Sequence, residues 1–216
     1  LGDGGETITG ATPPDPSSGA RGDYARGKAE SDFALLKMFR DDDLPVCILR
    51  PGVVVGEGTS PFHSGLGFYN NDQYCMGWNL GDNPLPFVLA GDVASAIAAS
   101  LTATGIDGKC FNLVGDVRLT AREYIRELAT ATNRPLNFYP QSIHKLFSVE
   151  IGKWVIKRLI GRNAPFPSLR DLKSRGMVAR FDNSDAKADL GWEPVSDLKE
   201  FFTATIQGAA PPATSS

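Results

Sequence analysis

Apolar residues recur at helical spacing in some segments of the chain and form short uninterrupted runs in others. Phe33, Leu36 and Phe39 repeat every three residues, and this spacing predicts a helix over 24–40. A continuous apolar run rich in β-branched residues follows and predicts one buried strand over 46–56. The first clear elements are therefore a helix that leads into a buried strand.

The rest of the chain continues to alternate between strand-like and helix-like segments. Thr120 stands three residues before Glu123, a spacing typical of a capping box at the start of a helix. Gly191 is placed to end a short helix over 182–191. Strands are also expected over 85–90, 109–115 and 135–140, helices over 92–104, 141–161 and from Ser196, and irregular structure over 1–22 and 57–84. This alternation predicts an α/β fold, with few strands for a complete doubly wound sheet.

Composition narrows the classes of protein that fit this pattern. Hydrophobic residues make up 42% of the 216 residues, and the net charge of −3 argues against a nucleic-acid binder that relies on a broad basic surface. No apolar run reaches membrane-spanning length and no signal-peptide pattern is visible, so a cytoplasmic location is expected. The three cysteines are expected to be free thiols, and the two histidines lack ligand-like spacing, so no metal site is expected.

The pair Tyr24 and Lys28 is the main candidate for chemistry. Residues four apart share one face of a helix, so the lysine ammonium can lie close to the tyrosine phenol. A cation about 4 Å from a phenolate attracts it by about 4 kcal/mol at an effective dielectric of about 20, the order needed for a tyrosine to transfer protons near neutral pH. On this motif alone, an exposed pair without a catalytic role remains an equal alternative.

The order of several motifs along the chain changes that balance. The pair is followed by LPVCILRPGVVVGEG, PFVLAGDVASAI, GKCFNLVGD, TAREYIRELA and FDNSDAKADLGWEPVSDLKEFF. In this order, the set resembles the extended short-chain dehydrogenase/reductase family, in its NAD-dependent epimerase/dehydratase branch. The resemblance covers nearly the whole chain. It implies the C-terminal part of a Rossmann-type doubly wound sheet together with a smaller mixed substrate-binding lobe.

The resemblance also implies roles for individual residues. Tyr24 corresponds to the general acid/base on a substrate hydroxyl or carbonyl, and Lys28 to the residue that holds the nicotinamide ribose of NAD or NADP. Pro51, Gly52 and Val53 correspond to the turn beside the nicotinamide, although they can also be read as a simple strand end. The implied activity is that of an NAD(P)-dependent epimerase, dehydratase or oxidoreductase acting on a small molecule, a nucleotide sugar or similar alcohol or ketone. A ketone or steroid-type reductase and a non-catalytic, dinucleotide-sensing relative are the alternatives.

One departure from the family pattern concerns the cofactor. The family's glycine-rich GxxGxxG turn, which places the pyrophosphate on a helix N-terminus, has no counterpart in this sequence, and its hydrogen-bonding Ser/Thr falls at or before Leu1. We therefore expect an incomplete chain that is inactive by itself. The expected domains are a remnant of the dinucleotide-binding domain over 1–56, a substrate lobe over 57–207 interleaved with late Rossmann elements over 85–115, and a disordered tail over 208–216.

The substrate side is less specified. His63, in a glycine-rich loop, is a weak candidate for a substrate contact. Cations that could hold a diphosphate are Arg118, Arg122, Arg158, Arg162 and Arg170. The basic and apolar stretch 145–162 is expected to pack on the substrate lobe rather than to act as a lid or contact a membrane surface. By resemblance, the whole protein is expected to form a homodimer through the helix that carries Tyr24 and Lys28.

Overall fold

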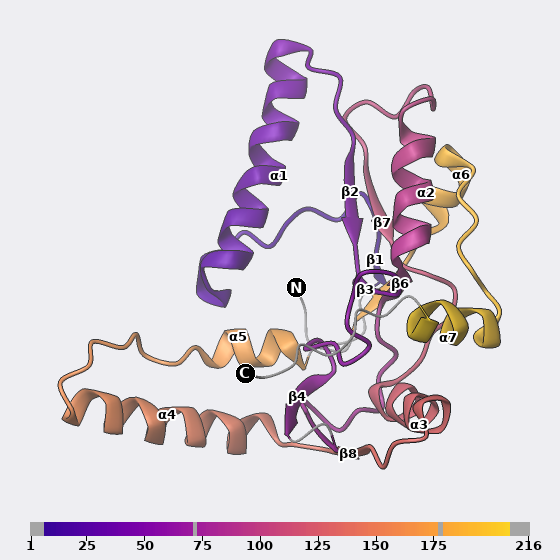
Figure 1. Cartoon of the computed structure of the whole chain (residues 1–216). Helices are drawn as coiled ribbons and strands as arrows, with labels where there is room; N and C mark the ends of the chain where they lie inside the picture. Colours follow the sequence, from indigo (N-terminus) through magenta and orange to yellow (C-terminus); the bar gives the residue numbers. More distant parts are fainter. Residues whose placement is uncertain (1–6, 71–72, 177–178, 208–216) are drawn as a thin grey trace.

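The computed structural model describes residues 7–70, 73–176 and 179–207; the predicted tail over 208–216 lies outside these residues. Two pairs of parallel strands form its centre (Figure 1): β2 (Ile48–Pro51) pairs with β7 (Cys110–Leu113), and β3 (Val53–Val55) pairs with β6 (Phe87–Leu89). Helix α1 (Asp23–Asp42) lies on one side of β2 and β7, and helices α2 (Ala90–Ser100) and α6 (Ser184–Leu190) lie on the other. The arrangement confirms the predicted α/β class.

The prediction of one strand over 46–56 is wrong, because the run divides at Gly52 into β2 and β3. The Gly52 N–H still donates to the carbonyl of Leu113 (3.0 Å), whereas the Val53 N–H donates to the carbonyl of Pro86 (2.7 Å). A side chain at position 52 would place its Cβ 2.0 Å from the Pro86 oxygen. Glycine thus allows the close backbone approach at which the chain changes its partner strand.

Two segments that looked irregular contain regular structure. Within 1–22, β1 (Thr7–Ile8) pairs in parallel with β9 (Arg180–Phe181), and a 3₁₀ turn, η1 (Ser18–Arg21), precedes α1. Within 57–84, β4 (Gly67–Asn70) and β5 (Tyr74–Gly77) pair antiparallel, and β8 (Asn137–Tyr139) joins β5 in parallel. The predictions failed because these strands are short, rich in glycine, or paired with residues far along the chain.

The remaining helices follow the sequence signals closely. They are α3 (Ala121–Thr132), α4 (Ile143–Leu159), α5 (Leu169–Arg175) and α7 (Leu198–Gln207). The predicted capping box starts α3: the Glu123 N–H donates to Thr120 Oγ1 (3.2 Å), and the Thr120 N–H donates to Glu123 Oε2 (2.9 Å). Gly191 follows α6 with a left-handed backbone, as predicted, whereas α5 was not foreseen. None of the described helices is long and apolar enough to cross a membrane.

The larger hydrophobic core lies between β6, α3 and α7. The rings of Phe87 and Tyr124 stack with centroids 4.6 Å apart, and both residues are fully buried. The Tyr124 hydroxyl donates to the carbonyl of Pro61 (3.0 Å), which satisfies its buried polar end. A second cluster around Phe111 and Trp192 packs α2 and α6 against β7. These two clusters fix the strands that carry the candidate site.

Candidate active site

Tyr24 and Lys28 lie together on the first turns of α1, as the sequence predicts. The Lys28 ammonium is 5.8 Å from the centroid of the Tyr24 ring, and the Tyr24 side chain is 80% exposed. Gly22, with a φ of 106°, turns the chain into the helix immediately before them. The pair therefore presents a phenol and an ammonium to solvent from one helix face.

Arg50 fastens this helix to the central strands, a role that the sequence reading missed. Its Nε donates to Asp32 of α1 (2.9 Å), and its Nη1 donates to the carbonyls of Gly10 (3.1 Å) and Thr12 (3.0 Å). One guanidinium on β2 thus holds both α1 and the loop that follows β1. The available signal was an arginine at the end of a buried strand, where an unpaired cation would be costly.

Pro51, Gly52 and Val53 lie where β2 passes into β3. Gly52 approaches the backbone of Pro86 closely, and Val53 donates its N–H to the same residue. Pro86 in turn lines a cavity of about 600 Å³. The predicted cofactor turn is therefore connected through Pro86 to the wall of this cavity.

The cavity is formed by the loop before β6, the end of α5 and the strand β9. Its lining residues are Asn79, Leu80, Asp82, Asn83, Pro84, Leu85, Pro86, Arg118, Gly176, Ala179, Arg180 and Phe181. The Arg118 Nη2 donates to the carbonyl of Phe181 (3.3 Å). Arg118 was among the predicted cations, whereas Arg180 was missed because it lies on a strand that is only two residues long.

Three other predicted candidates have partners within the fold. Arg122 does not line the cavity, but it forms an ion pair (2.8 Å) with Asp82, which does. Arg170 contacts Asp15 in the loop before α1. His63 accepts a hydrogen bond at Nδ1 from the Gly65 N–H (2.9 Å), and burial lowers the pKa of its imidazole, so this histidine stabilises its own turn.

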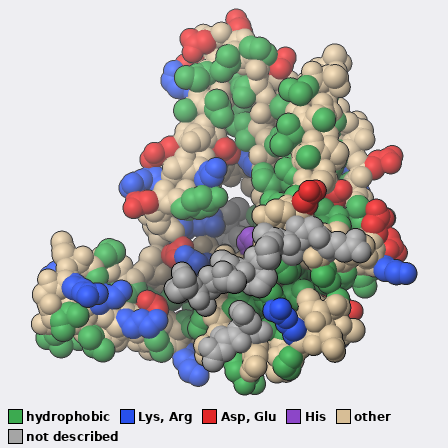
Figure 2. Space-filling view, viewed as in Figure 1, with side chains coloured by type: hydrophobic (Ala, Val, Ile, Leu, Met, Phe, Trp, Pro, Cys, Tyr) green, Lys and Arg blue, Asp and Glu red, His purple; other side chains and the backbone are tan. Residues whose placement is uncertain are grey.

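Helix α4 extends away from the centre as an arm, and it contacts α5, another segment of the expected substrate lobe. None of its residues is buried. Its inner contact is made by Trp154, whose ring packs edge-on against Phe166 (5.2 Å) and whose Nε1 donates to the carbonyl of Ala164 (3.0 Å). Figure 2 shows basic and hydrophobic side chains side by side at the end of this arm.

Comparisons with known proteins point in one direction. The male sterility protein family, an NAD-binding family, matches residues 6–81. UDP-glucose 4-epimerase of Vibrio cholerae is 25% identical over 189 residues, which cover 86% of this chain and 53% of that enzyme. The crystal structure of UDP-glucuronic acid 4-epimerase from Bacillus cereus, in complex with UDP-glucuronic acid and NAD, matches with a TM-score of 0.64 at 17% identity, covering 96% of this chain and 57% of that one.

These matches agree with the tyrosine–lysine helix and the parallel strands around it. The chain is thus similar to a nucleotide-sugar 4-epimerase over most of its length, and it shares the fold of such enzymes. It spans about half the length of the Vibrio cholerae epimerase that it matches. A shorter match is to (4-alkanoyl-5-oxo-2,5-dihydrofuran-3-yl)methyl phosphate reductase of Streptomyces griseus. It is 40% identical over 58 residues, which cover 27% of this chain and 21% of that enzyme.

Proposed function

We propose that this chain contributes the acid/base pair and part of the substrate pocket of an NAD(P)-dependent epimerase or dehydratase that acts on a nucleotide sugar. The observation that carries the proposal is the placement of the Lys28 ammonium 5.8 Å from the ring of Tyr24 on an open helix face. The similarity to nucleotide-sugar 4-epimerases supports the substrate class.

Each member of the pair has a defined task. The Tyr24 hydroxyl takes a proton from, or returns one to, the oxygen of the substrate carbon that is oxidised or reduced. The Lys28 ammonium stabilises the phenolate and has donors left for the hydroxyls of a ribose. When bound, NAD(P) supplies the hydride acceptor or donor that this proton transfer accompanies.

The residues fit one end of the cofactor. Exposed hydroxyl and ammonium donors on α1 suit the nicotinamide ribose. For the pyrophosphate, the described residues provide no strand, glycine-rich turn and helix start in sequence. We therefore propose that the 216-residue chain alone binds NAD or NADP weakly. Titration calorimetry would test this, and micromolar affinity would contradict it.

The cavity is our candidate for the substrate's diphosphate. Arg118 and Arg180 are the two cations among its lining residues. Guanidinium groups hold phosphate oxygens with directional, charge-assisted hydrogen bonds. Replacing Arg180 by glutamine would remove one cation from the wall, and we expect a higher KM for the nucleotide sugar with a smaller change in kcat.

The decisive experiment is turnover by Tyr24→Phe in a protein of the relatives' full length that contains these residues. We expect the chemical step to slow by at least about two orders of magnitude, the usual scale of general acid/base catalysis, while cofactor binding is retained. Tyr139→Phe is the matched control, because Tyr139 is also an exposed tyrosine but lies on β8. Near-normal turnover by Tyr24→Phe would refute the catalytic assignment.

A carbonyl reductase is the second candidate, favoured by the 40% identity to the Streptomyces griseus phosphate reductase over 58 residues. The same Tyr24 hydroxyl would then protonate the oxygen of a carbonyl as it is reduced. Interconversion of UDP-glucose and UDP-galactose without net cofactor consumption would support the epimerase. Stoichiometric oxidation of NADPH by a carbonyl substrate would support the reductase.

A further inference from the structure

Helix α5 connects the cavity wall to the loop that leads into α1. At its far end, the carbonyl of Gly176 accepts a hydrogen bond from the Asn79 Nδ2 (2.9 Å), and both residues line the cavity. At its near end, the Ser168 Oγ donates to the carbonyl of Ala20 (2.7 Å), in η1. Figure 1 shows α5 beneath the end of α1 at which the chain enters that helix. One short helix therefore spans the distance between the two parts of the candidate site.

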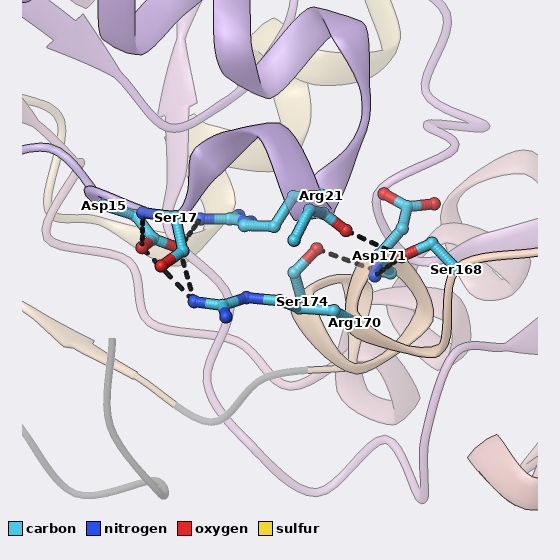
Figure 3. A network of polar contacts seen from close by, with 8 residues as sticks. Asp15, Ser17, Arg21, Ser168, Arg170, Asp171 and Ser174 are labelled. Atoms are coloured by element: carbon cyan, nitrogen blue, oxygen red, sulfur yellow. Dashed lines mark hydrogen bonds and ion pairs between the residues drawn. The ribbon is translucent and has the colours of Figure 1, made fainter.

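The strongest contact at the near end is an ion pair between Asp15 and Arg170 (Figure 3). The Arg170 Nη2 lies 3.2 Å from one carboxylate oxygen of Asp15 and 3.3 Å from the other. The Ser17 N–H donates to the same carboxylate (2.9 Å), and the Arg21 Nη1 is 3.9 Å away. The Asp15 side chain is only 5% exposed, so its charge depends on these partners.

The charge of Asp15 is maintained despite its burial. Burial acts to raise the pKa of the Asp15 carboxyl, but the Ser17 hydrogen bond and the Arg170 charge outweigh it, and the pKa lies below its ordinary value. Removing Arg170 would leave a buried carboxylate with one N–H donor and a distant guanidinium. The loop over 15–21 would then have to move to solvate it.

Movement of this loop reaches Tyr24 directly. Arg21 is the last residue of η1, Gly22 follows it, and α1 begins at Asp23. The Gly22 carbonyl accepts a hydrogen bond from the Arg26 N–H (3.1 Å), so the turn and the first turn of the helix are joined. A shift at Asp15 therefore changes where the first turn of α1 is held.

We propose that the Asp15–Arg170 pair couples the cavity wall to the position of the first turn of α1, and that Arg170 is a positioning residue for Tyr24. The inference rests on the proposed function only for the role of Tyr24. A ligand that moves the loop at Asn79 would shift α5, and this shift would change the position of Tyr24.

The test is hydrogen–deuterium exchange of the 216-residue chain, which requires no turnover. We expect Arg170→Leu to raise amide exchange over residues 15–26 about fivefold, the scale of one partly exposed ion pair, and to leave β6 and α3 unchanged. Arg170→Lys should restore most of the protection. The matched control is Arg175→Leu, which removes an ion pair with Asp171 (3.1 Å) on the same helix and a cation–π contact with Trp78, but no contact with the loop over 15–21. It should leave residues 15–26 unchanged.

The coupling itself is tested from the other end of α5. Asn79→Ala, which breaks the contact to Gly176, should also raise exchange over 15–26, and should add nothing in the Arg170→Leu background. Unchanged exchange in Arg170→Leu, or strictly additive effects of the two substitutions, would overturn the proposal.

In a protein of the relatives' full length, Arg170→Leu should lower kcat with little change in KM for the nucleotide sugar, and Arg170→Lys should recover it. Absence of any turnover in the wild type would contradict the proposed function. The exchange results would still decide whether the pair positions the first turn of α1.

Discussion

The core between β6, α3 and α7 and the helix α1 differ sharply in how they are held. Phe87 and Tyr124 are fully buried and stacked, whereas α1 buries only Ala29 over its entire length. Figure 2 shows the surface hollowed between α1 and the central strands. The core is stabilised by removal of apolar surface from water, whereas α1 is held by partly buried side chains such as Phe39 together with polar contacts such as that of Arg50 with Asp32. Stability and candidate chemistry thus reside in different parts of this molecule.

The largest expected difference between the two regions is the loss in the free energy of unfolding when a phenylalanine of each is replaced by alanine. Phe87→Ala should lower the free energy of unfolding by about 3–5 kcal/mol, because it leaves a cavity in the main core. Phe33→Ala, at a residue of α1 that is 45% exposed, should lower the free energy of unfolding by less than about 1 kcal/mol. Urea denaturation of both variants would check this. Equal losses would show that α1 contributes to the core as strongly as β6 does.

A smaller effect is expected at the helix starts. Thr120→Ala removes the capping box of α3 and should destabilise the protein by about 1 kcal/mol. Ser142→Ala is the matched control, because Ser142 stands at the N-cap of α4 but its side chain makes no capping hydrogen bond. Thermal unfolding should separate the two. A comparable loss for Ser142→Ala would mean that the arm is coupled to the core through its first turn.

The smallest expected effects are opposite pH dependences at two buried aspartates. Burial raises the pKa of Asp92, in α2, so its contribution to stability is greatest below the ordinary value of 3.8 and is lost as the pH rises through the raised pKa. Asp92→Asn should therefore be the more stable form at neutral pH, and its advantage should vanish in acid. Its carbonyl could still accept the Val195 N–H, which now lies 3.2 Å from Asp92 Oδ2.

For Asp15, whose pKa is lowered, the sign is reversed. Its stabilisation is present above 3.8 and is lost as the pH falls through the lowered pKa. Asp15→Asn should be less stable than the wild type at neutral pH, and the difference should close in acid. Urea unfolding of both aspartate variants across this range would check the signs. A parallel pH dependence would contradict the assignment of Asp15 as a paired carboxylate.

The sequence predicted best where local chemistry decides the structure. The Thr120–Glu123 capping box and Gly191 place helix ends correctly because their partners lie within a few residues. The face shared by Tyr24 and Lys28 follows from helical geometry alone. These are short-range constraints, and they require no knowledge of the rest of the fold.

Contacts between segments far apart in the sequence could not be predicted from such local signals. Strand β1 exists because residues 180–181 lie alongside it, and neither partner has a strand-like pattern of its own. The same holds for the site: Asp15 and Arg170 are separated by most of the chain, and nothing local in either segment identifies the pair. The burial of Asp15, which requires a nearby cation, is visible only in the structure.

The change of partner at Gly52 also determines the order in which the protein can be assembled during translation. Among the described strands, β3 pairs with Phe87–Leu89 and β2 pairs with Cys110–Leu113, and both of these partners are translated later. The apolar run from Ile48 to Val55 cannot form these two parallel pairs while the intervening residues are made. Such delayed parallel pairing is intrinsically slow and leaves an unpaired, aggregation-prone strand edge exposed. During that interval the apolar run is a site of aggregation risk in the nascent chain, and β2 and β3 acquire these two partners only after it.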